Sequence, residues 1–496
     1  MKIYKLIFLF LFSSSLLISC AKDDDDVVDD EVGKTGPDRN LDVEDFIYKG
    51  MNNIYLYKAY VPELANTYFS SQADLNDFLD DFDSPEDLFY NGLVYEYREQ
   101  DKFSFMTDDY IALENSFAGT STTTGMNYGF SLHPNDVTET KVLLYVRYVQ
   151  PNTSAAEAGI ERGMIFNKVD GQEMTVSNYT SLVAPENFTL HEAEFDENLD
   201  VIDLDETYNL SKAEYTANPV YITKTIEVDG KNVGYLMYNS FTADFDPELN
   251  AAFADFKAEG IDELVLDLRY NGGGRVETAV DLSSMITGQF EGEIFNQQQW
   301  NPSYQAYFEE ENPDNLVDRF NDKIGNGDLI NSLNLQKVYI IAGRSSASAS
   351  ELVINGLDAW IDVIHVGDNT VGKFQASVTL YDSSNFGKQN ANPDHKYAIQ
   401  PLVYKSANAQ GKSDYVDGLV PDIEVPEYVN QYEALGDPSE PLLKAALEDI
   451  QGVRKASYLS KSPEFKVLDE SGSETIDFQK MYTDEIPADL LKRNDF

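Results

Sequence analysis

Cysteine, histidine and basic residues are scarce in this chain of 496 residues, and each scarcity excludes a class of protein. One cysteine excludes a disulfide within the chain, and with only four histidines we expect no metal ion and no cofactor. The 36 Lys and Arg residues face 87 Asp and Glu residues, which gives a formal net charge of −51. Because the basic residues form no cluster, the sequence argues against a nucleic-acid partner, and an anionic membrane surface would repel the chain.

The composition is otherwise that of a folded protein with several domains. Hydrophobic residues make up 42% and aromatic residues 12% of the chain, so its acidity is not a sign of general disorder. The predicted fold class is multidomain α/β. We predict a signal peptide at 1–20, an acidic linker at 21–40, a small helical domain at 41–118, a β-rich domain at 119–217, an α/β core with a mixed, largely parallel sheet at 218–450, and a polar, peripheral C-terminal extension at 451–496.

The N-terminus has the features of an export signal. Two lysines precede the apolar run Leu6–Phe12, which is too short to span a bilayer. Leu17–Cys20 resembles the lipobox of bacterial lipoproteins, which implies cleavage before Cys20 and attachment of lipid to its thiol. Asp23–Asp26 resembles the acidic tag of some surface lipoproteins, so we expect an exported protein that is lipid-anchored in the envelope of a Gram-negative bacterium, in the outer membrane or at the cell surface. The alternative is ordinary cleavage near Ser19, which leaves Cys20 as a free thiol.

The β-rich domain has a recognisable order of elements. Strands are expected at Met126–Leu132 and Val142–Val149, followed within residues 154–171 by a short helix, a glycine turn, a strand and an Asp-Gly turn. This order resembles a PDZ domain of the type associated with bacterial proteases. The resemblance implies a groove that captures the C-terminus of a protein or peptide by adding it to a strand. The alternative is an unrelated small β-rich module.

Three short segments of the α/β core carry residues suited to chemistry. Asp267–Gly274 runs from a buried strand into three consecutive glycines, where backbone N–H groups can line up to hold an anion. Ser345–Glu351 lies between a strand and a helix, and Gly367–Phe374 follows another strand. The last segment fits the Gly-x-x-x-x-Gly-Lys pattern of a phosphate-binding loop, but Phe374 stands where Ser or Thr would bind Mg²⁺. We therefore exclude a phosphate-binding loop.

Ser348 is open to two interpretations. With Glu351 three residues later it fits a capping box, in which its hydroxyl only terminates the helix. Alternatively it is a nucleophile at a helix N-terminus, where N–H groups and the helix dipole favour a developing oxyanion. In that case Lys373, 25 residues further on, is suited to act as a base once burial keeps its amine neutral.

Taken together, these segments resemble those of the C-terminal processing, or tail-specific, serine peptidases. The shared features are the Ser346–Glu351 segment, the Gly-Lys turn, the Asp267–Gly274 loop and the upstream PDZ-like domain. The resemblance implies hydrolysis of peptide bonds in proteins by a Ser–Lys dyad, with Ser348 as the nucleophile and Lys373 as the general base. It also implies an oxyanion hole formed by the N–H groups of Gly273 and Ala349.

One position departs from the family pattern. Many members place a glutamine four residues after the lysine, where this chain has Ser377, while Gln375 stands two residues earlier. Ser377 and Gln375 are therefore both candidates for the third catalytic residue. The departure also leaves open a non-catalytic lipoprotein that binds peptides on a peptidase-like scaffold. The histidines offer no Ser-His-Asp triad, because His365 is expected in the core and the others lie outside the motif segments.

Overall fold

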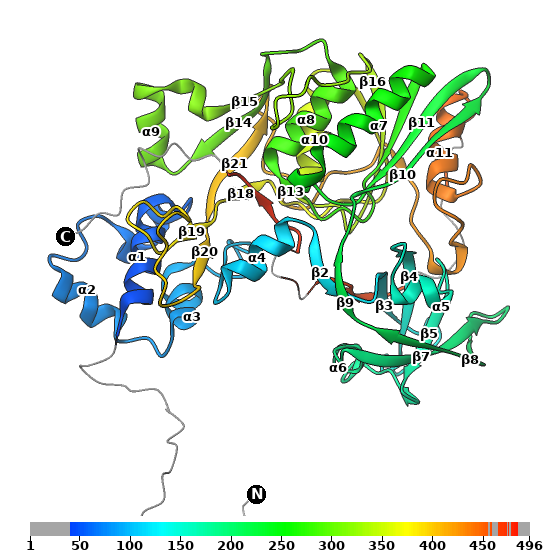
Figure 1. The fold of residues 1–496 in the computed structure, drawn as a ribbon, viewed down its shortest axis with the longest axis horizontal. Helices are drawn as coiled ribbons and strands as arrows, with labels where there is room; N and C mark the ends of the chain where they lie inside the picture. Colours follow the sequence, from blue (N-terminus) through cyan, green and yellow to red (C-terminus); the bar gives the residue numbers. More distant parts are fainter. Residues whose placement is uncertain (1–39, 455–456, 459–464, 474, 476–477, 485–496) are drawn as a thin grey trace, which may run out of the picture. The chain divides into compact units, whose positions relative to one another are not determined.

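The computed structural model describes residues 40–454, 457–458, 465–473, 475 and 478–484 (Figure 1). The predicted signal peptide, the predicted lipidation site Cys20 and the predicted linker up to residue 39 lie outside the described residues. Within the described ranges, no helix combines the length and the apolar character needed to cross a bilayer.

Residues 40–117 form the predicted helical region, which confirms that expectation. Phe46 and Met51 of the first helix are fully buried, while acidic residues fill its first turn. Ser71 caps the second helix by accepting a hydrogen bond from the Asp74 N–H at 3.1 Å. The elements are α1 (Asp42–Ile54), η1 (Lys58–Tyr60), η2 (Pro62–Leu64), α2 (Gln72–Leu79), α3 (Pro85–Asp87), η3 (Leu88–Leu93), β1 (Phe105–Thr107) and α4 (Tyr110–Phe117).

A six-stranded sheet with the order β10-β11-β12-β16-β17-β22 forms the centre of the α/β core. β10 is antiparallel to β11, and the remaining neighbours pair in parallel, which confirms the mixed, largely parallel sheet. The strands are β10 (Val220–Val228), β11 (Lys231–Tyr238), β12 (Glu263–Asp267), β16 (Lys337–Ala342), β17 (Asp362–Gly367) and β22 (Ile423–Glu424).

Helices cover both faces of this sheet because successive strand residues point to opposite sides. Leu264 and Leu266 of β12 pack into the same core as α7, α8 and α10, whereas Val265 packs into the core of α11. Figure 1 shows α7, α8 and α10 together in green and α11 apart from them in orange. The helices are α7 (Asp246–Glu259), α8 (Val276–Thr287), α10 (Ala349–Asp358) and α11 (Pro441–Ile450).

A second six-stranded sheet has the order β13-β24-β18-β21-β14-β15. Its strand β18 begins two residues after Lys373. The chain after Lys373 forms two short strands, β18 and β19, which belong to different sheets. A three-stranded sheet β1-β20-β19 joins the helical region to the core. The strands are β13 (Gly274–Arg275), β14 (Ile294–Trp300), β15 (Val317–Arg319), β18 (Gln375–Ser377), β19 (Leu380–Tyr381), β20 (Ala398–Gln400), β21 (Leu402–Asn408) and β24 (Met481–Tyr482).

The β-rich part of the chain is built around antiparallel strands in the order β3-β4-β5-β7-β8. Strands β3 and β4 have the predicted bounds. The acidic residues 190–216, whose sequence shows little pattern, form much of the long β7–β8 hairpin and β9. The elements are β2 (Thr120–Thr123), β3 (Met126–Leu132), β4 (Val142–Val149), α5 (Ser154–Ala158), β5 (Ile165–Val169), β6 (Gln172–Glu173), α6 (Tyr179–Val183), β7 (Asn187–Phe195), β8 (Val201–Ser211) and β9 (Ala213–Thr216).

The described residues of the C-terminal extension are not peripheral, and this corrects the sequence-based expectation. Strand β23 (Val467–Glu470) pairs with β3, and β24 lies between β13 and β18. Met481 is fully buried in the main core, and Phe465 is buried in a smaller cluster beside β4 and β5. The polar composition of 451–496 conceals these contacts because each is made by only a few apolar residues.

Candidate active site

Ser348 lies at the turn from β16 into α10 in a strained backbone conformation. Its φ is +67°, a region that non-glycine residues adopt at a cost of about 1–3 kcal/mol and that is enriched at functional sites. Both contacts of the capping box are present, but only one of them has full hydrogen-bond geometry. The Glu351 carboxylate accepts the Ser348 N–H at 2.8 Å, whereas the buried Ser348 Oγ has no hydrogen-bond partner of normal geometry among the described residues. The hydroxyl is therefore left free for another role.

Glu351 joins the backbones of the serine and lysine segments. Its Oε2 accepts the N–H groups of Ser348 at 2.8 Å and of Lys373 at 2.9 Å. Its Oε1 accepts the Thr370 hydroxyl at 2.5 Å and the Gly372 N–H at 2.6 Å. Burial raises the pKa of this carboxyl, and the four donors favour its ionised form. Because one oxygen holds both N–H groups, the backbones of Ser348 and Lys373 lie side by side.

Lys373 is a fully buried lysine on the turn that follows β17. Gly372 allows this turn because its φ is +94°, and a Cβ there would lie 2.5 Å from the Val416 carbonyl oxygen. Lys373 Nζ has no hydrogen-bond partner among the described residues and lies 5.3 Å from the centre of the Phe103 ring. Burial first, and then the nearby positive charge of Lys480, holds the pKa of Lys373 well below its ordinary value. An amine whose pKa is lowered in this way is suited to accept a proton.

The glycine loop after β12 is tied to the serine segment. The Asn271 carbonyl accepts the Ala347 N–H at 3.2 Å and the Ser350 hydroxyl at 2.9 Å. Gly273 has a φ of +112°, and a Cβ there would lie 2.5 Å from Ser348 Cβ. The loop backbone thus passes directly beside the serine. In this structure the Gly273 N–H donates to Asn271 Oδ1 at 2.9 Å.

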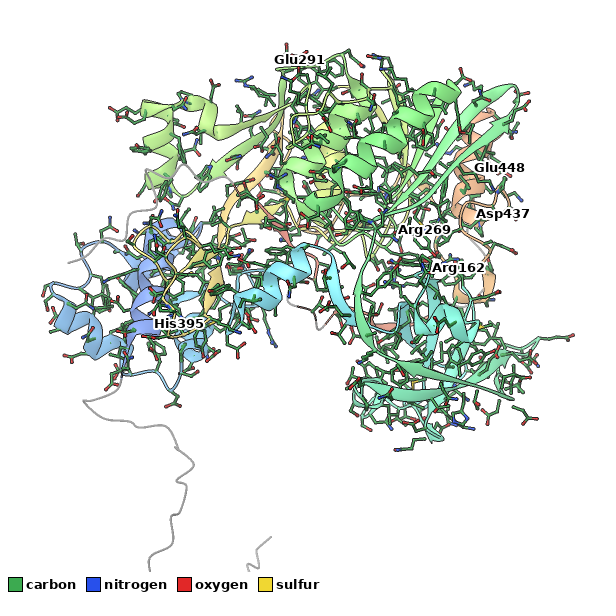
Figure 2. The ribbon with its side chains drawn as sticks, viewed as in Figure 1. Arg162, Arg269, Glu291, His395, Asp437 and Glu448 are labelled. Atoms are coloured by element: carbon green, nitrogen blue, oxygen red, sulfur yellow. The ribbon has the colours of Figure 1, made fainter. Side chains whose placement is uncertain are left out.

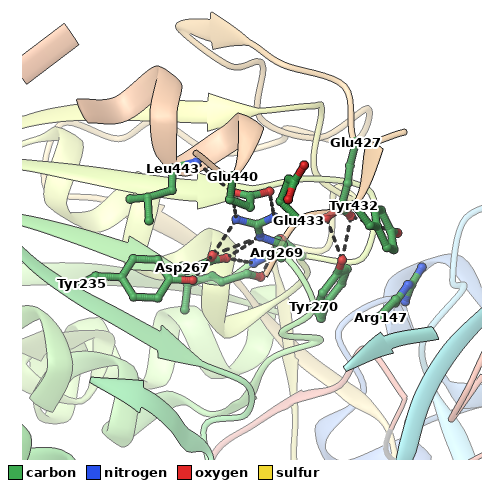
Figure 3. A network of polar contacts seen from close by, with 12 residues as sticks. Arg147, Tyr235, Asp267, Arg269, Tyr270, Glu427, Tyr432, Glu433, Glu440 and Leu443 are labelled. Carbon is green, nitrogen blue, oxygen red and sulfur yellow. Dashed lines mark hydrogen bonds and ion pairs between the residues drawn. The ribbon is translucent and has the colours of Figure 1, made fainter. Parts of the chain in front are cut away.

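A buried charge network holds the first half of this loop (Figure 3). Arg269 is 3% exposed and donates to Asp267 at 2.8–3.0 Å and to Glu440 at 2.7 and 3.0 Å. It also lies 3.0 Å from Glu427, which accepts the Tyr270 hydroxyl at 2.7 Å. Burial alone would raise the pKa of Glu427, but the positive charges of Arg162 and Arg269 lower it to about 2. These two arginines are labelled in Figure 2, where they lie close together. The loop is therefore fixed by paired charges rather than by apolar packing alone.

The two candidates for a third catalytic residue have other partners in this structure. The Ser377 hydroxyl lies 2.6 Å from Gln400 Oε1 and 3.0 Å from the Met481 carbonyl oxygen. Gln375 Nε2 donates to the Tyr57 hydroxyl at 3.4 Å. Neither side chain holds the Lys373 amine in this arrangement.

The histidines lie apart from the serine. His365 is 2% exposed in β17, and burial lowers its pKa, as expected for a core histidine. His395 pairs with Asp382 at 3.0 Å and lies beside Phe46 of α1 (Figure 2). His133 and His191 belong to the β-rich part. Within the described residues, no three His, Cys, Asp or Glu side chains are arranged to hold a metal ion.

Sequence reasoning did not assign several residues that shape this site. Glu351 was interpreted only as a cap, and Asn271, Phe103 and Gln400 received no role. Asp267 and Arg269 are charged residues at the end of an apolar strand. This pattern indicates a network of buried charges, since buried charges require partners. Gln400 has no such signal, because it meets Ser377 only through the pairing of separate strands.

We expect Glu351→Gln to lower kcat of the peptide-bond hydrolysis that the sequence resemblance implies about 10- to 100-fold, while leaving KM nearly unchanged. An amide has one acceptor where the carboxylate has two, so at least one backbone N–H loses its partner and the two segments shift. Steady-state kinetics would show the kcat effect. Glu44→Gln in α1, where the glutamate is 3% exposed, is the matched control and should leave kcat intact. A change in KM alone, or equal losses in both variants, would contradict this positioning role.

The comparisons with known proteins agree with the arrangement of these segments. Residues 232–425 match peptidase family S41, and residues 42–105 match the peptidase S41 N-terminal domain. A carboxyl-terminal-processing protease of Picosynechococcus is 25% identical over 260 residues, which cover 52% of this chain and 54% of that protein. A carboxy-terminal-processing protease of Bartonella bacilliformis is 24% identical over 338 residues, which cover 64% of this chain and 68% of that protein.

A solved structure gives the same result at the level of the fold. An S41 protease from Bacteroides fragilis superposes with a TM-score of 0.62 at 25% identity, and covers 82% of this chain and 97% of that one. The match includes most of the described elements. The chain therefore belongs to the family of C-terminal processing peptidases, peptidase family S41.

Proposed function

We propose that this protein is a serine endopeptidase that hydrolyses peptide bonds in protein substrates with a Ser348–Lys373 dyad. The observation that carries the proposal is the pair of buried, unpartnered groups, Ser348 Oγ and Lys373 Nζ, on backbones held by Glu351. Buried polar atoms without partners are costly, and a catalytic role accounts for two of them in adjacent segments.

In the proposed reaction the neutral Lys373 amine accepts the proton of the Ser348 hydroxyl. Ser348 Oγ then attacks the scissile carbonyl carbon, and the Ala349 N–H at the start of α10 stabilises the oxyanion. The Gly273 N–H is the second proposed donor, and it becomes available when its bond to Asn271 Oδ1 is released or shared. The tetrahedral intermediate expels the amine, which takes the proton from Lys373. Water activated by the same amine then hydrolyses the acyl-enzyme.

Two further proposals concern how substrates arrive. The β-rich part is proposed to be a PDZ-like domain that captures substrate C-termini; the order α5, Gly159 turn, β5 and Asp170–Gly171 turn supports it. The protein is also proposed to be exported and anchored through lipid on Cys20 in the outer membrane or at the cell surface. The lipobox-like sequence alone supports the anchor.

The function is tested by labelling the purified protein with a serine-reactive fluorophosphonate and by incubating it with an unstructured protein. We expect cleavage of the substrate and a single adduct on Ser348, located by mass spectrometry. Intact substrate together with an unlabelled Ser348 would contradict the proposal and favour the non-catalytic peptide-binding alternative.

A further inference from the structure

The chain's own C-terminal segment occupies the two places where the proposed function needs a substrate. We define this segment as residues 465–473 and 478–484. Its first strand, β23, pairs antiparallel with β3 at the edge of the β-rich sheet, with Glu470 opposite Gly129. The Ser471 N–H continues the ladder to the Tyr128 carbonyl at 2.8 Å. This antiparallel addition to an edge strand is how peptide-capturing domains bind a ligand.

The second part of the segment lies against the glycine loop and the nucleophile. β24 inserts between β13 and β18, where Met481 is opposite Gly274 and Tyr482 is opposite Ser377. A Cβ at Gly273 would lie 2.9 Å from the Lys480 carbonyl oxygen. Gly273 is also the residue whose backbone passes beside Ser348 Cβ. The segment therefore runs along the glycine loop, directly beside the proposed oxyanion donor Gly273.

Glu470 connects these two places through a buried charge. Its carboxylate pairs with Arg147 of β4 and accepts the Ser345 hydroxyl at 2.6 Å. The Arg147 side chain is 8% exposed and the Glu470 side chain 14%. Arg147 also lies 4.9 Å from the ring centre of Tyr270 in the glycine loop, and Figure 3 shows it beside that tyrosine. One carboxylate of the segment thus joins the β-rich sheet to the serine segment.

Two cavities beside the segment mark part of the space along this route. One of about 160 Å³ is bounded by Gly272 and Gly273 on one side and by Glu470 and Gln479 on the other. Another of about 380 Å³ lies between β3, α6 and Ser471. Neither holds an extended polypeptide while the segment is in place, because the edge of β3 is already paired.

We propose that residues 465–473 and 478–484 act as an internal occupant of the peptide groove and the active-site cleft, and that a substrate strand must displace them. The inference rests on the proposed function. It names the regulation of that same site: binding at the groove is opposed in cis, and the cleft opens when an incoming strand takes the edge of β3 and the Arg147 position.

Truncation is a poor test, because Phe465 and Met481 are buried and their loss exposes the core. The sharper variant is Glu470→Lys, which places two positive charges together and weakens the internal strand. Lys466→Ala is the matched control. Lys466 lies on the same segment, and its side chain makes an exposed ion pair with Glu139, which the substitution removes. Glu470→Gln, which keeps the side-chain shape, provides a second variant if the lysine form does not fold.

The first measurement does not depend on catalysis. In a Ser348→Ala background, a fluorescent synthetic peptide of residues 465–473 is titrated and its anisotropy recorded. We expect about tenfold tighter binding or more to Glu470→Lys, an intermediate gain for Glu470→Gln and no gain for Lys466→Ala. Hydrogen exchange at residues 467–470 should become faster in the same order. Unchanged affinity and exchange in both Glu470 variants would overturn the inference.

The second measurement separates the inference from the proposed function. With Ser348 intact, we expect Glu470→Lys to raise kcat/KM on an unstructured protein about tenfold over the parent and over Lys466→Ala. Tighter peptide binding with no cleavage by any form would overturn the proposed function and leave the occupied groove standing. Cleavage by the parent that Glu470→Lys fails to raise would overturn the inference alone.

Discussion

Ser348→Ala is expected to lower kcat on an unstructured protein about 10⁵- to 10⁶-fold, the scale found when a catalytic serine is removed. The alanine keeps the turn into α10 but removes the atom that would form the acyl-enzyme. Because Ser348 Oγ has no hydrogen bond to lose among the described residues, Tm should stay within a few degrees of the parent. Cleavage of a labelled protein and thermal unfolding measure the two effects.

The control is Ser283→Ala in α8. Ser283 is also fully buried, and its hydroxyl donates to the Ala279 carbonyl at 2.8 Å within its own helix. We expect this variant to keep its activity, with a small decrease in Tm from the lost hydrogen bond. If Ser348→Ala retained the parent rate, the assignment of the nucleophile would be wrong.

Lys373→Met is expected to abolish hydrolysis and at the same time to stabilise the fold. Methionine has a similar length and no charge, so it fills the space beside Phe103 without a buried, unpartnered amine. We expect a loss of about 10⁴-fold or more in kcat and a gain of about 1–3 kcal/mol in the free energy of unfolding. Hydrolysis assays and chemical denaturation of the same preparation test both.

The gain in stability has a predictable pH dependence. The pKa of Lys373 is lowered in the folded protein, so between that pKa and the ordinary value of 10.5 the unfolded chain binds more protons. The parent protein therefore loses stability as the pH falls through this range, and Lys373→Met does not. The pH-dependent part of the difference between the two should be largest at low pH and should vanish above pH 10.5. The parent's kcat should rise with pH as the Lys373 amine deprotonates, and it should reach a plateau below pH 10.5.

Lys337→Met in β16 is the control for both effects. Its amine lies 3.4 Å from Glu263, and its side chain is 32% exposed, so it is neither unpartnered nor fully buried. We expect activity to be retained and stability to change by less than about 1 kcal/mol. Equal stabilisation by both methionine variants, or an active Lys373→Met protein, would contradict the role assigned to the buried amine.

Local pattern alone was sufficient to predict much of the fold. β3 and β4 have the bounds that the sequence predicted. The segments around Ser348 and Lys373 were also identified, because each is a short motif at a strand end. Local signals of this kind depend only on neighbouring residues, so they can be read from the sequence.

The partners of those residues were decided by tertiary structure. Ser377 was proposed near the lysine, yet its hydroxyl meets Gln400, because the pairing of β18 with β21 and β24 sets where it points. Glu351 looked like a helix cap, and only the approach of the turn after β17 gives its carboxylate the N–H groups of Gly372 and Lys373. Such contacts join residues far apart in sequence, and no local period records them.

The sequence by itself determined the order of many elements, the motif segments and the candidate reactive side chains. Tertiary structure decided that residues 465–473 and 478–484 pack against β3 and between β13 and β18. β23 and β24 are only a few residues long, too short to show periodicity, and their stability comes from edges that other strands provide. A strand whose partners are supplied by distant parts of the chain leaves almost no mark on its own sequence.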